Sequence, residues 1–165
     1  MAEQQRKIYT VGHSTRQQSE LIELLEHYGV RTLVDIRRIP FSRHNPQFNR
    51  ETVMKAMEEA GIRYEHMTEL GGVKPSQEVI DRARSCSERS RGFAGYMETP
   101  VFKSGLERAI ALSAESQIAL MCAEADPSHC HRFWVADALV ERGIEVEHIV
   151  NIGDLRDHPR NLFSF

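Results

Sequence analysis

Residues 118–122 read Ile-Ala-Leu-Met-Cys, and this run of apolar side chains is the clearest buried strand in the sequence. A strand without alternating polar positions is typical of a parallel sheet that is covered on both faces. Residues 32–36, Thr-Leu-Val-Asp-Ile, have the same character around a single acidic residue. Both runs therefore predict a sheet that lies inside the molecule.

Around these two runs, short β-type segments alternate with segments in which apolar residues have helical spacing. The further strands expected are residues 7–11, 62–66 and 146–150, and the expected helices are residues 19–28, 49–60, 75–87, 106–114 and 131–142. This alternation implies right-handed crossovers between parallel strands. The predicted fold is α/β: a three-layer α/β/α arrangement with a mainly parallel sheet of about five strands, in a single domain over residues 1–165. The stretch after Asn151 is expected to be a surface tail.

The composition is that of an ordinary globular protein, with 41% apolar and 27% charged residues in 165. A net charge of −3 argues against binding of nucleic acid by the electrostatic attraction of the whole domain, although it is compatible with a local basic patch. No segment approaches the roughly 20 apolar residues that span a bilayer, and the first residues lack the apolar core of a signal peptide. Three cysteines are too few for a disulfide framework. We therefore expect a cytoplasmic protein with reduced thiols and no membrane partner.

The position of the unusual residues predicts where the protein works. In an open parallel sheet, ligands bind beyond the carboxyl ends of the strands, where helix N-termini also point. The turns at the opposite edge are short and chemically plain. The loops that follow the strands are rich in His, Cys, Arg and Gly, and they comprise residues 12–15, 35–44, 70–74 and 122–132. The sequence therefore predicts one polar site at this edge.

Arginine offers paired donors to phosphate or carboxylate oxygens, and the helix that begins near His131 favours negative charge at its N-terminus. We therefore expect Arg37 and Arg132 to converge on one anion. No metal is assigned to the site, and the cofactor is left open. The catalytic candidates are His13, Cys122, Glu124 and His131, and the candidates for substrate binding are Ser14, Arg37, Arg38, Arg43, Gly71, Gly72 and Arg132.

Several of these residues have purely structural alternatives. Gly12 and the pair Gly71-Gly72 could only supply positive φ angles at turns. Ser14 or Thr15 could simply cap a helix, which is the commoner use of such residues.

The charged and thiol candidates have structural alternatives as well. Either Arg37 or Arg38 could be an ion-pair partner of Asp35 or Glu124, because buried arginines normally need a carboxylate. Cys122 could be no more than a small buried side chain at the end of its strand.

A metal site is a further alternative around Cys130 and His131, together with His129. The spacing is not a closed Cys₂His₂ pattern, so zinc would need ligands from other loops, such as His13 or His44.

Several segments together resemble the bacterial family known as domain of unknown function 488. They cover nearly the whole chain in the order of that family. The resemblance implies a compact α/β domain whose site lies in these loops, and it implies no particular activity. The matching segments are residues 9–15, 33–40 with Ser42-Arg43, 70–72, 93–97, 120–124 and 130–132.

A second, weaker similarity is to rhodanese-type sulfurtransferases and their phosphatase relatives. Residues 33–37 are similar to the Asp-x-Arg strand end of those enzymes, and Cys122 stands where their catalytic half has its cysteine. Those enzymes hold the cysteine in a loop of a few residues, whereas nine residues separate Cys122 from Arg132 here. Glu124 and Asp126 would also repel a thiolate and an incoming anion.

Three classes of function follow, in this order. The first is an enzyme or binding protein for a phosphate-bearing small molecule, a nucleotide or a nucleic-acid end. The second is a rhodanese-like, cysteine-dependent sulfurtransferase or phosphatase. The third is a non-catalytic nucleic-acid or protein-binding module that uses the loop of residues 41–48.

Overall fold

The computed structural model describes residues 6–71, 96–126 and 131–159. Within these ranges, helices and strands alternate as the sequence predicts; the helix expected at residues 75–87 lies outside them. The strands are β1 (Lys7–Gly12), β2 (Thr32–Asp35), β3 (Arg63–His66), β4 (Ile118–Cys122), β5 (Glu145–Asn151) and β6 (Asp154–Asp157). The helices are α1 (Gln18–His27), α2 (Arg50–Glu59), α6 (Pro100–Glu115) and α7 (Arg132–Glu141), with the 3₁₀ turns η1 (Pro46–Phe48) and η2 (Thr68–Leu70).

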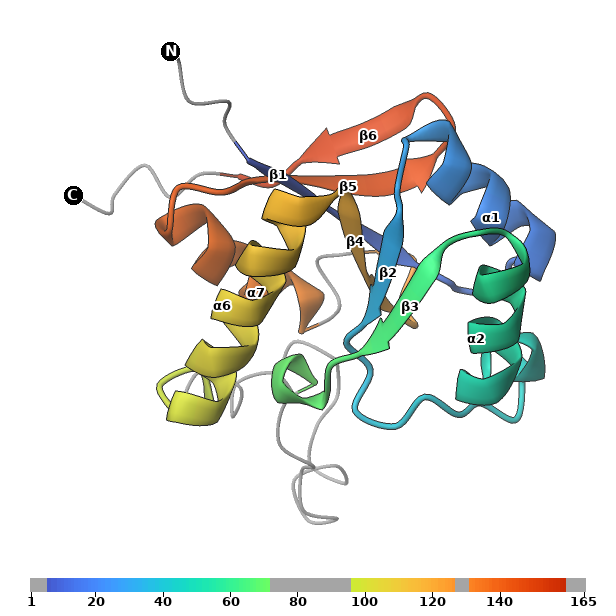
Figure 1. The fold of residues 1–165 in the computed structure, drawn as a ribbon, viewed down its shortest axis with the longest axis horizontal. Coiled ribbons are helices and arrows are strands. Elements are labelled where there is room, and N and C mark those ends of the chain that lie inside the picture. Colours follow the sequence, from blue (N-terminus) through green and yellow to red (C-terminus); the bar gives the residue numbers. More distant parts are fainter. Residues whose placement is uncertain (1–5, 72–95, 127–130, 160–165) are drawn as a thin grey trace.

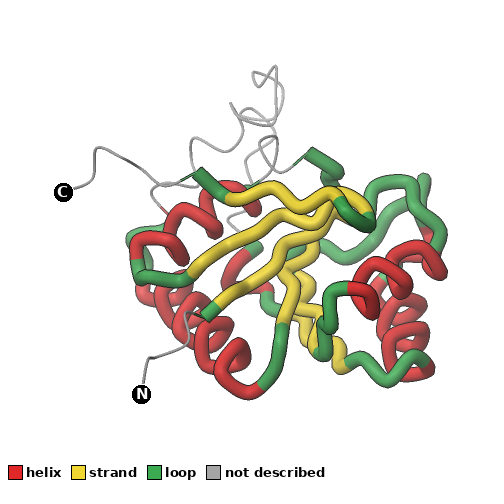
Figure 2. Tube along the Cα trace, turned by 90° about the horizontal axis from the view of Figure 1, so that it is seen from above, coloured by secondary structure: helices red, strands yellow, loops and turns green. Residues whose placement is uncertain are grey.

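The strands form one sheet in the order β3-β2-β4-β1-β5-β6. The first five strands in chain order pair in parallel, and only β6 is antiparallel, to β5. Helices cover both faces of the sheet, α1 and α2 on one side and α6 and α7 on the other (Figures 1 and 2). The predicted three-layer α/β/α fold with a mainly parallel sheet is confirmed.

The sixth strand corrects the expectation of a surface tail after Asn151. The chain turns back at Gly153, whose φ of 81° is the left-handed conformation that glycine adopts without strain. The four residues of β6, Asp-Leu-Arg-Asp, then pair with β5. No apolar alternation marks this segment, because its stability comes from backbone hydrogen bonds to an existing edge strand.

Each face of the sheet has its own apolar core. Ile8, Val34 and Leu120 pack against α6 and α7, whereas Val11, Leu33 and Met121 pack against α1 and α2. All five residues of β4 are buried, as the sequence predicts for a strand covered on both faces.

Helix α6 begins earlier than the spacing of its apolar residues indicates, at Pro100 instead of residue 106. The hydroxyl of Thr99 accepts a hydrogen bond from the backbone N–H of Phe102 at 3.3 Å. A threonine N-cap followed by proline in the first turn is a strong start signal, because it satisfies backbone groups that the helix leaves without partners. In the described ranges, no helix is long and apolar enough to cross a membrane.

Candidate functional site

The loops that follow β1, β2 and β4 meet at one edge of the sheet. Strand pairing continues past the strand ends, since the backbone N–H of His13 donates to the carbonyl of Cys122 and that of Ser14 to the carbonyl of Ala123, both at 3.0 Å. In the same way, Ile36 donates to Met121. Figure 1 shows the long connection from β2 to α2 running along this edge. The structure therefore brings the predicted loops together.

Two glycines at this edge allow close approach of backbones. A Cβ atom on Gly12 would lie 1.8 Å from the carbonyl oxygen of Glu124, and one on Gly71 would lie 2.9 Å from Cα of Arg38. The glycines with positive φ are others in the chain, so the alternative of turn geometry does not explain Gly12 or Gly71. Their role is to let neighbouring loops touch.

On the α1/α2 face, each nitrogen of the Arg37 guanidinium has a hydrogen-bond partner. Its Nε donates to Asp35 Oδ1 at 2.9 Å and its Nη2 donates to Asp35 Oδ2 at 2.7 Å, which is a two-pronged ion pair. Nη2 also donates to the carbonyl of Phe48 at 2.7 Å, and Nη1 donates to Nε2 of His13 at 3.2 Å. Arg37 is only 6% exposed. This is the structural alternative of an arginine held by Asp35.

His13 is a buried, neutral member of the same cluster. Its ring stacks on Phe48 with centroids 4.5 Å apart, and its Nδ1 donates to the carbonyl of Ser14 at 2.9 Å. Because Nε2 accepts from Arg37, both ring nitrogens are occupied in the neutral form. Burial, reinforced by the charge of Arg37, lowers the pKa of His13. A proton on Nε2 would therefore require His13 to separate from Arg37.

Two residues of this cluster carried no sequence signal for a site. The hydroxyl of Tyr64 donates to Asp35 Oδ2 at 2.5 Å, and burial together with this carboxylate raises the pKa of Tyr64. His66 donates from Nε2 to the carbonyl of Arg37 at 2.8 Å. Ser14, next to the cluster, has a φ of 49°, a conformation that non-glycine residues seldom adopt and that often occurs at functional sites.

On the α6/α7 face, Arg132 presents the opposite situation. Its side chain is completely buried at the first residue of α7. Nη2 donates to the backbone carbonyls of Glu124 and Ala125, both at 3.2 Å. In the part of the chain that the structure describes, Nε and Nη1 have no hydrogen-bond partner. A buried guanidinium with neither a carboxylate nor a full set of acceptors is an unusual feature of a folded protein.

Cys122 and His131 lie beside this arginine. Cys122 is 1% exposed and its thiol donates to the carbonyl of Glu124 at 3.5 Å. His131 donates from Nε2 to the carbonyl of Ile36 at 3.2 Å, which ties the start of α7 to the end of β2. Burial lowers the pKa of His131, although the nearby Cys122 opposes the change.

Arg16 is a second cation near Arg132, and the sequence did not single it out. Its Nε donates to the carbonyl of Gly12 at 3.2 Å, its Nη2 to the carbonyl of Val150 at 2.5 Å, and its Nη1 to Oδ1 of Asn151 at 3.2 Å. Burial lowers the pKa of Arg16, and the charge of Arg132 adds to the effect while Glu20 opposes it.

A chain of four side chains links the same region to the surface of α7. Oγ1 of Thr10 lies 2.5 Å from Nδ1 of His148, Nε2 of His148 lies 2.9 Å from Nδ1 of His158, and Nε2 of His158 lies 2.6 Å from Oδ1 of Asp137. Burial lowers the pKa of His148 to about 3, and the charges of Arg132 and His158 contribute. Thr10 is 138 positions from His148 and the others are 10 or more positions apart, so no local sequence pattern indicated the chain.

The remaining candidates lie at the rim of the site or outside the described residues. Arg38, Arg43 and Glu124 are exposed. Gly72, which was a candidate for substrate binding, lies outside the described residues, as do His129 and Cys130, on which the metal alternative depended.

With this geometry in hand, comparison with known proteins identifies the family. The family model described as "Domain of unknown function DUF488" matches residues 17–139, which is most of the chain. The chain belongs to the DUF488 family. A search of curated proteins and a search of solved structures returned no match. The similarity to rhodanese-type enzymes thus gains no support from these searches.

The DUF488 match covers only part of the candidate site. It includes Arg37, Cys122, His131 and Arg132, but it begins after the loop that carries His13. The family model therefore spans both buried arginines of this edge and the loops that hold them.

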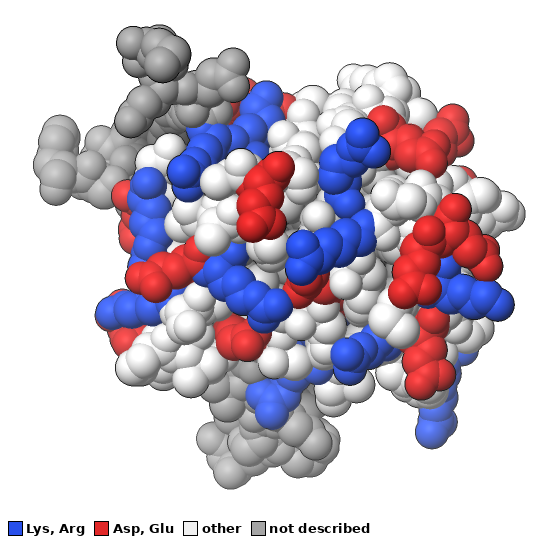
Figure 3. Space-filling model, in the orientation of Figure 1, with Lys and Arg blue, Asp and Glu red and all other residues white. Residues whose placement is uncertain are grey.

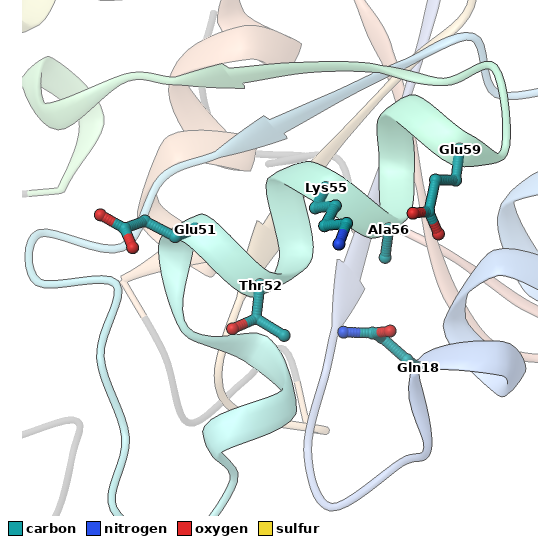
Figure 4. A pocket seen from close by; sticks show the side chains of 6 residues that line it. All are labelled: Gln18, Glu51, Thr52, Lys55, Ala56 and Glu59. Atoms are coloured by element: carbon teal, nitrogen blue, oxygen red, sulfur yellow. The ribbon is translucent and has the colours of Figure 1, made fainter.

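Elsewhere, a groove of about 410 Å³ runs along α2 and contains none of the predicted site residues. Figure 4 shows Gln18, at the start of α1, across the groove from the side chains of α2. The groove is lined by Gln18, Glu51, Thr52, Lys55, Ala56 and Glu59.

Acidic and basic side chains are interspersed over the face seen in Figure 3, so a preference for anions must come from a local arrangement of side chains.

Proposed function

We propose that this DUF488 protein binds a phosphate-bearing ligand at the carboxyl edge of its sheet, with Arg132 as the residue that contacts the phosphate. The observation that carries the proposal is the completely buried guanidinium whose Nε and Nη1 have no acceptor among the described residues. These two nitrogens carry three N–H donors. A bound anion would supply the acceptors that the chain itself does not provide.

The burial of the Arg132 charge gives an energetic reason for an anion at this place. A buried charge without a partner is strongly destabilising, and a hydrogen bond to a charged group contributes about 1.5–3 kcal/mol. Arg132 also begins α7, where the backbone N–H groups and the helix dipole favour an anion. The unpaired side chain and the helix N-terminus are independent reasons to expect negative charge at the same place.

The nearby charges favour a compact, strongly charged group such as phosphate. Arg16 adds positive charge in this region, although its own guanidinium already donates to Gly12, Val150 and Asn151. Glu124 and Asp126 are exposed on the loop that Arg132 contacts, and they would weaken a diffuse attraction for anions. Affinity would therefore depend on direct, oriented contacts with guanidinium groups, which suit phosphate oxygens.

Two further groups define the chemistry that this site could carry. His131 lies next to Arg132 in the sequence, and the thiol of Cys122 donates to the carbonyl of Glu124, which is also an acceptor for Arg132. If the ligand is turned over, His131 is the proton carrier that fits this position, and Cys122 is the nucleophile. The proposal covers binding; turnover would be an additional property of the same site.

The test is calorimetric titration of the wild type and of Arg132→Lys with inorganic phosphate and with nucleoside monophosphates. We expect binding by the wild type and an affinity about tenfold or more lower in the variant. The ammonium group of lysine is a point charge that cannot replace the paired donors of a planar guanidinium. Arg142→Lys is the matched control, since Arg142 is exposed at the other end of α7. Equal affinities in all three proteins, or no binding of any of these anions by the wild type, would contradict the proposal.

A further inference from the structure

We infer that the loop between β2 and α2 binds single-stranded nucleic acid, so that the phosphate-bearing ligand of the Arg132 site is a nucleic-acid strand. The inference rests on the proposed function, because it assigns the ligand of that same edge to a class. It is supported by the charge, the exposed side chains and the internal hydrogen bonds of residues 36–50, which we call the β2–α2 loop.

The β2–α2 loop differs in charge from the rest of the chain. Together with Arg50, the first residue of α2, it contains four arginines (residues 37, 38, 43 and 50) and His44, and it contains no aspartate or glutamate. The whole chain, in contrast, has 24 acidic residues against 21 lysines and arginines. One of the four arginines is neutralised by Asp35, and the other three are exposed. The loop is thus a local basic surface on an acidic protein, of the kind that contacts a phosphate backbone.

The same loop exposes apolar side chains to solvent. Phe41 is 62% exposed and Ile39 is 60% exposed, which makes them the most exposed large apolar side chains in the described ranges. An exposed aromatic ring between arginines offers a stacking surface for a base, and every base has a face that can use it. Bases are available for stacking only where they are unpaired, so the pattern fits a single strand and not a duplex.

The loop is held in this arrangement by hydrogen bonds. The backbone N–H of Ser42 donates to Oδ1 of Asn49 at 2.8 Å, that of Asn45 to Oγ of Ser42 at 3.0 Å, and that of Arg50 to the carbonyl of Pro40 at 2.9 Å. On the buried side of the loop, Arg37 donates to the carbonyl of Phe48. The buried ion pair of Arg37 therefore serves as the base of the loop, and Phe41 is presented to solvent on a preorganised surface, which lowers the entropic cost of binding.

The β2–α2 loop adjoins the Arg132 site. Strands β2 and β4 are neighbours in the sheet, and His131 donates to the carbonyl of Ile36, the first residue of the loop. The side chain of His131 thus connects the start of α7 to the start of the loop. A strand whose phosphate lies at Arg132 can continue across His131 onto the basic loop.

The experiment is fluorescence anisotropy with a labelled 12-nucleotide single-stranded DNA that carries a 5′-phosphate, at several salt concentrations. We expect Phe41→Ala to weaken binding about 5- to 140-fold, because stacking of one base is lost. Arg43→Gln should lower the slope of log K against log salt by about 0.7, the value for one phosphate contact with a single strand. The matched controls are Ile152→Ala, an exposed apolar residue after β5, and Arg31→Gln, an exposed arginine at the opposite edge.

Three results would overturn the inference: no binding of the strand by the wild type, equal affinity for single-stranded and duplex DNA, or loop variants that behave like the controls. Binding to anionic phosphatidylglycerol vesicles without binding to DNA would also overturn it and would assign the loop to a lipid surface. The proposed function is tested separately. Phosphate binding that depends on Arg132, in a protein that binds no DNA, would leave the Arg132 site intact and remove only the nucleic-acid ligand.

Discussion

Arg37 and Arg132 are both buried at the carboxyl edge of the sheet, but they lie on opposite faces of it and have opposite surroundings. Arg37 has a carboxylate, a carbonyl and a histidine nitrogen as acceptors. Arg132 has two backbone carbonyls, and its Nε and Nη1 have no partner among the described residues. The first arginine is held within the chain by Asp35, whereas the second is the one that we propose contacts a ligand.

The contrast shows what a buried charge reveals about function. A guanidinium that is paired with a carboxylate and has an acceptor at each nitrogen gains little from an added anion. One that lacks acceptors gains much more from the same anion, because its desolvation is otherwise uncompensated. The predictions below test this difference, beginning with the largest effect.

The largest effect is expected for Arg37→Met. The substitution leaves the carboxylate of Asp35 buried without its cation, so the free energy of unfolding should fall by about 3–5 kcal/mol. Urea denaturation gives this value. The double variant Asp35→Asn/Arg37→Met should recover part of the loss, because no buried charge then remains. If Arg37→Met alone unfolds at the wild-type urea concentration, Arg37 is not a scaffold residue and the contrast fails.

Gly12→Ala should disturb the loop that holds Arg132. The added Cβ would meet the carbonyl oxygen of Glu124, which is also an acceptor for Arg132. We expect a loss of stability of about 1–3 kcal/mol or more, together with weaker phosphate binding, since the loop must move. Gly29→Ala is the control, because an added Cβ at Gly29 would meet no atom within 4 Å and the φ of 69° would strain only the substituted alanine. The control should bind phosphate like the wild type.

Acid should destabilise the protein through His148. Burial, followed by the charge of Arg132, lowers the pKa of His148 to about 3 in the folded state, whereas an unfolded chain has a histidine pKa of about 6.5. Between these pH values the unfolded state binds the extra proton, so stability falls as the pH falls, by at most about 1.4 kcal/mol per pH unit for this residue. Stability should be insensitive to His148 above pH 7.

The measurement is urea denaturation of the wild type and of His148→Gln from pH 7.5 to pH 4.5. The variant should show a shallower dependence on pH, by about one proton. His44→Gln, at an exposed histidine, is the control and should keep the wild-type slope. A variant with the wild-type slope would show that another group causes the acid sensitivity.

The smallest effect is expected for Arg132→Met without ligand. Removing an unpaired buried charge and replacing it with an apolar side chain of similar length should change the free energy of unfolding by less than about 1 kcal/mol, or raise it. Phosphate should then stabilise the wild type and not the variant in thermal melts, because only the folded wild type binds it. A large loss of stability in Arg132→Met would place Arg132 with Arg37 in the scaffold.

Much of the fold could be predicted from local patterns in the sequence. The apolar run of residues 118–122 and the alternation of strands and helices indicated the layers and the parallel sheet. Because parallel strands end at the same edge, the loops that carry Arg37 and Arg132 could also be assigned to one edge. Strand β6 was missed, because its pairing with β5 depends on backbone hydrogen bonds that leave no apolar pattern.

The sequence by itself thus determined the α/β fold, the edge at which polar residues gather and the family. Only the tertiary structure decided which arginine has an acceptor at each nitrogen and which lacks acceptors among the described residues, because acceptors come from side chains and carbonyls that folding brings near. For the same reason, the sequence did not predict the hydrogen-bonded series of side chains from Thr10 to Asp137. Its first hydrogen bond joins residues that are 138 positions apart. Periodicity reports which face of an element is buried, but it carries no information about which distant polar group will lie opposite.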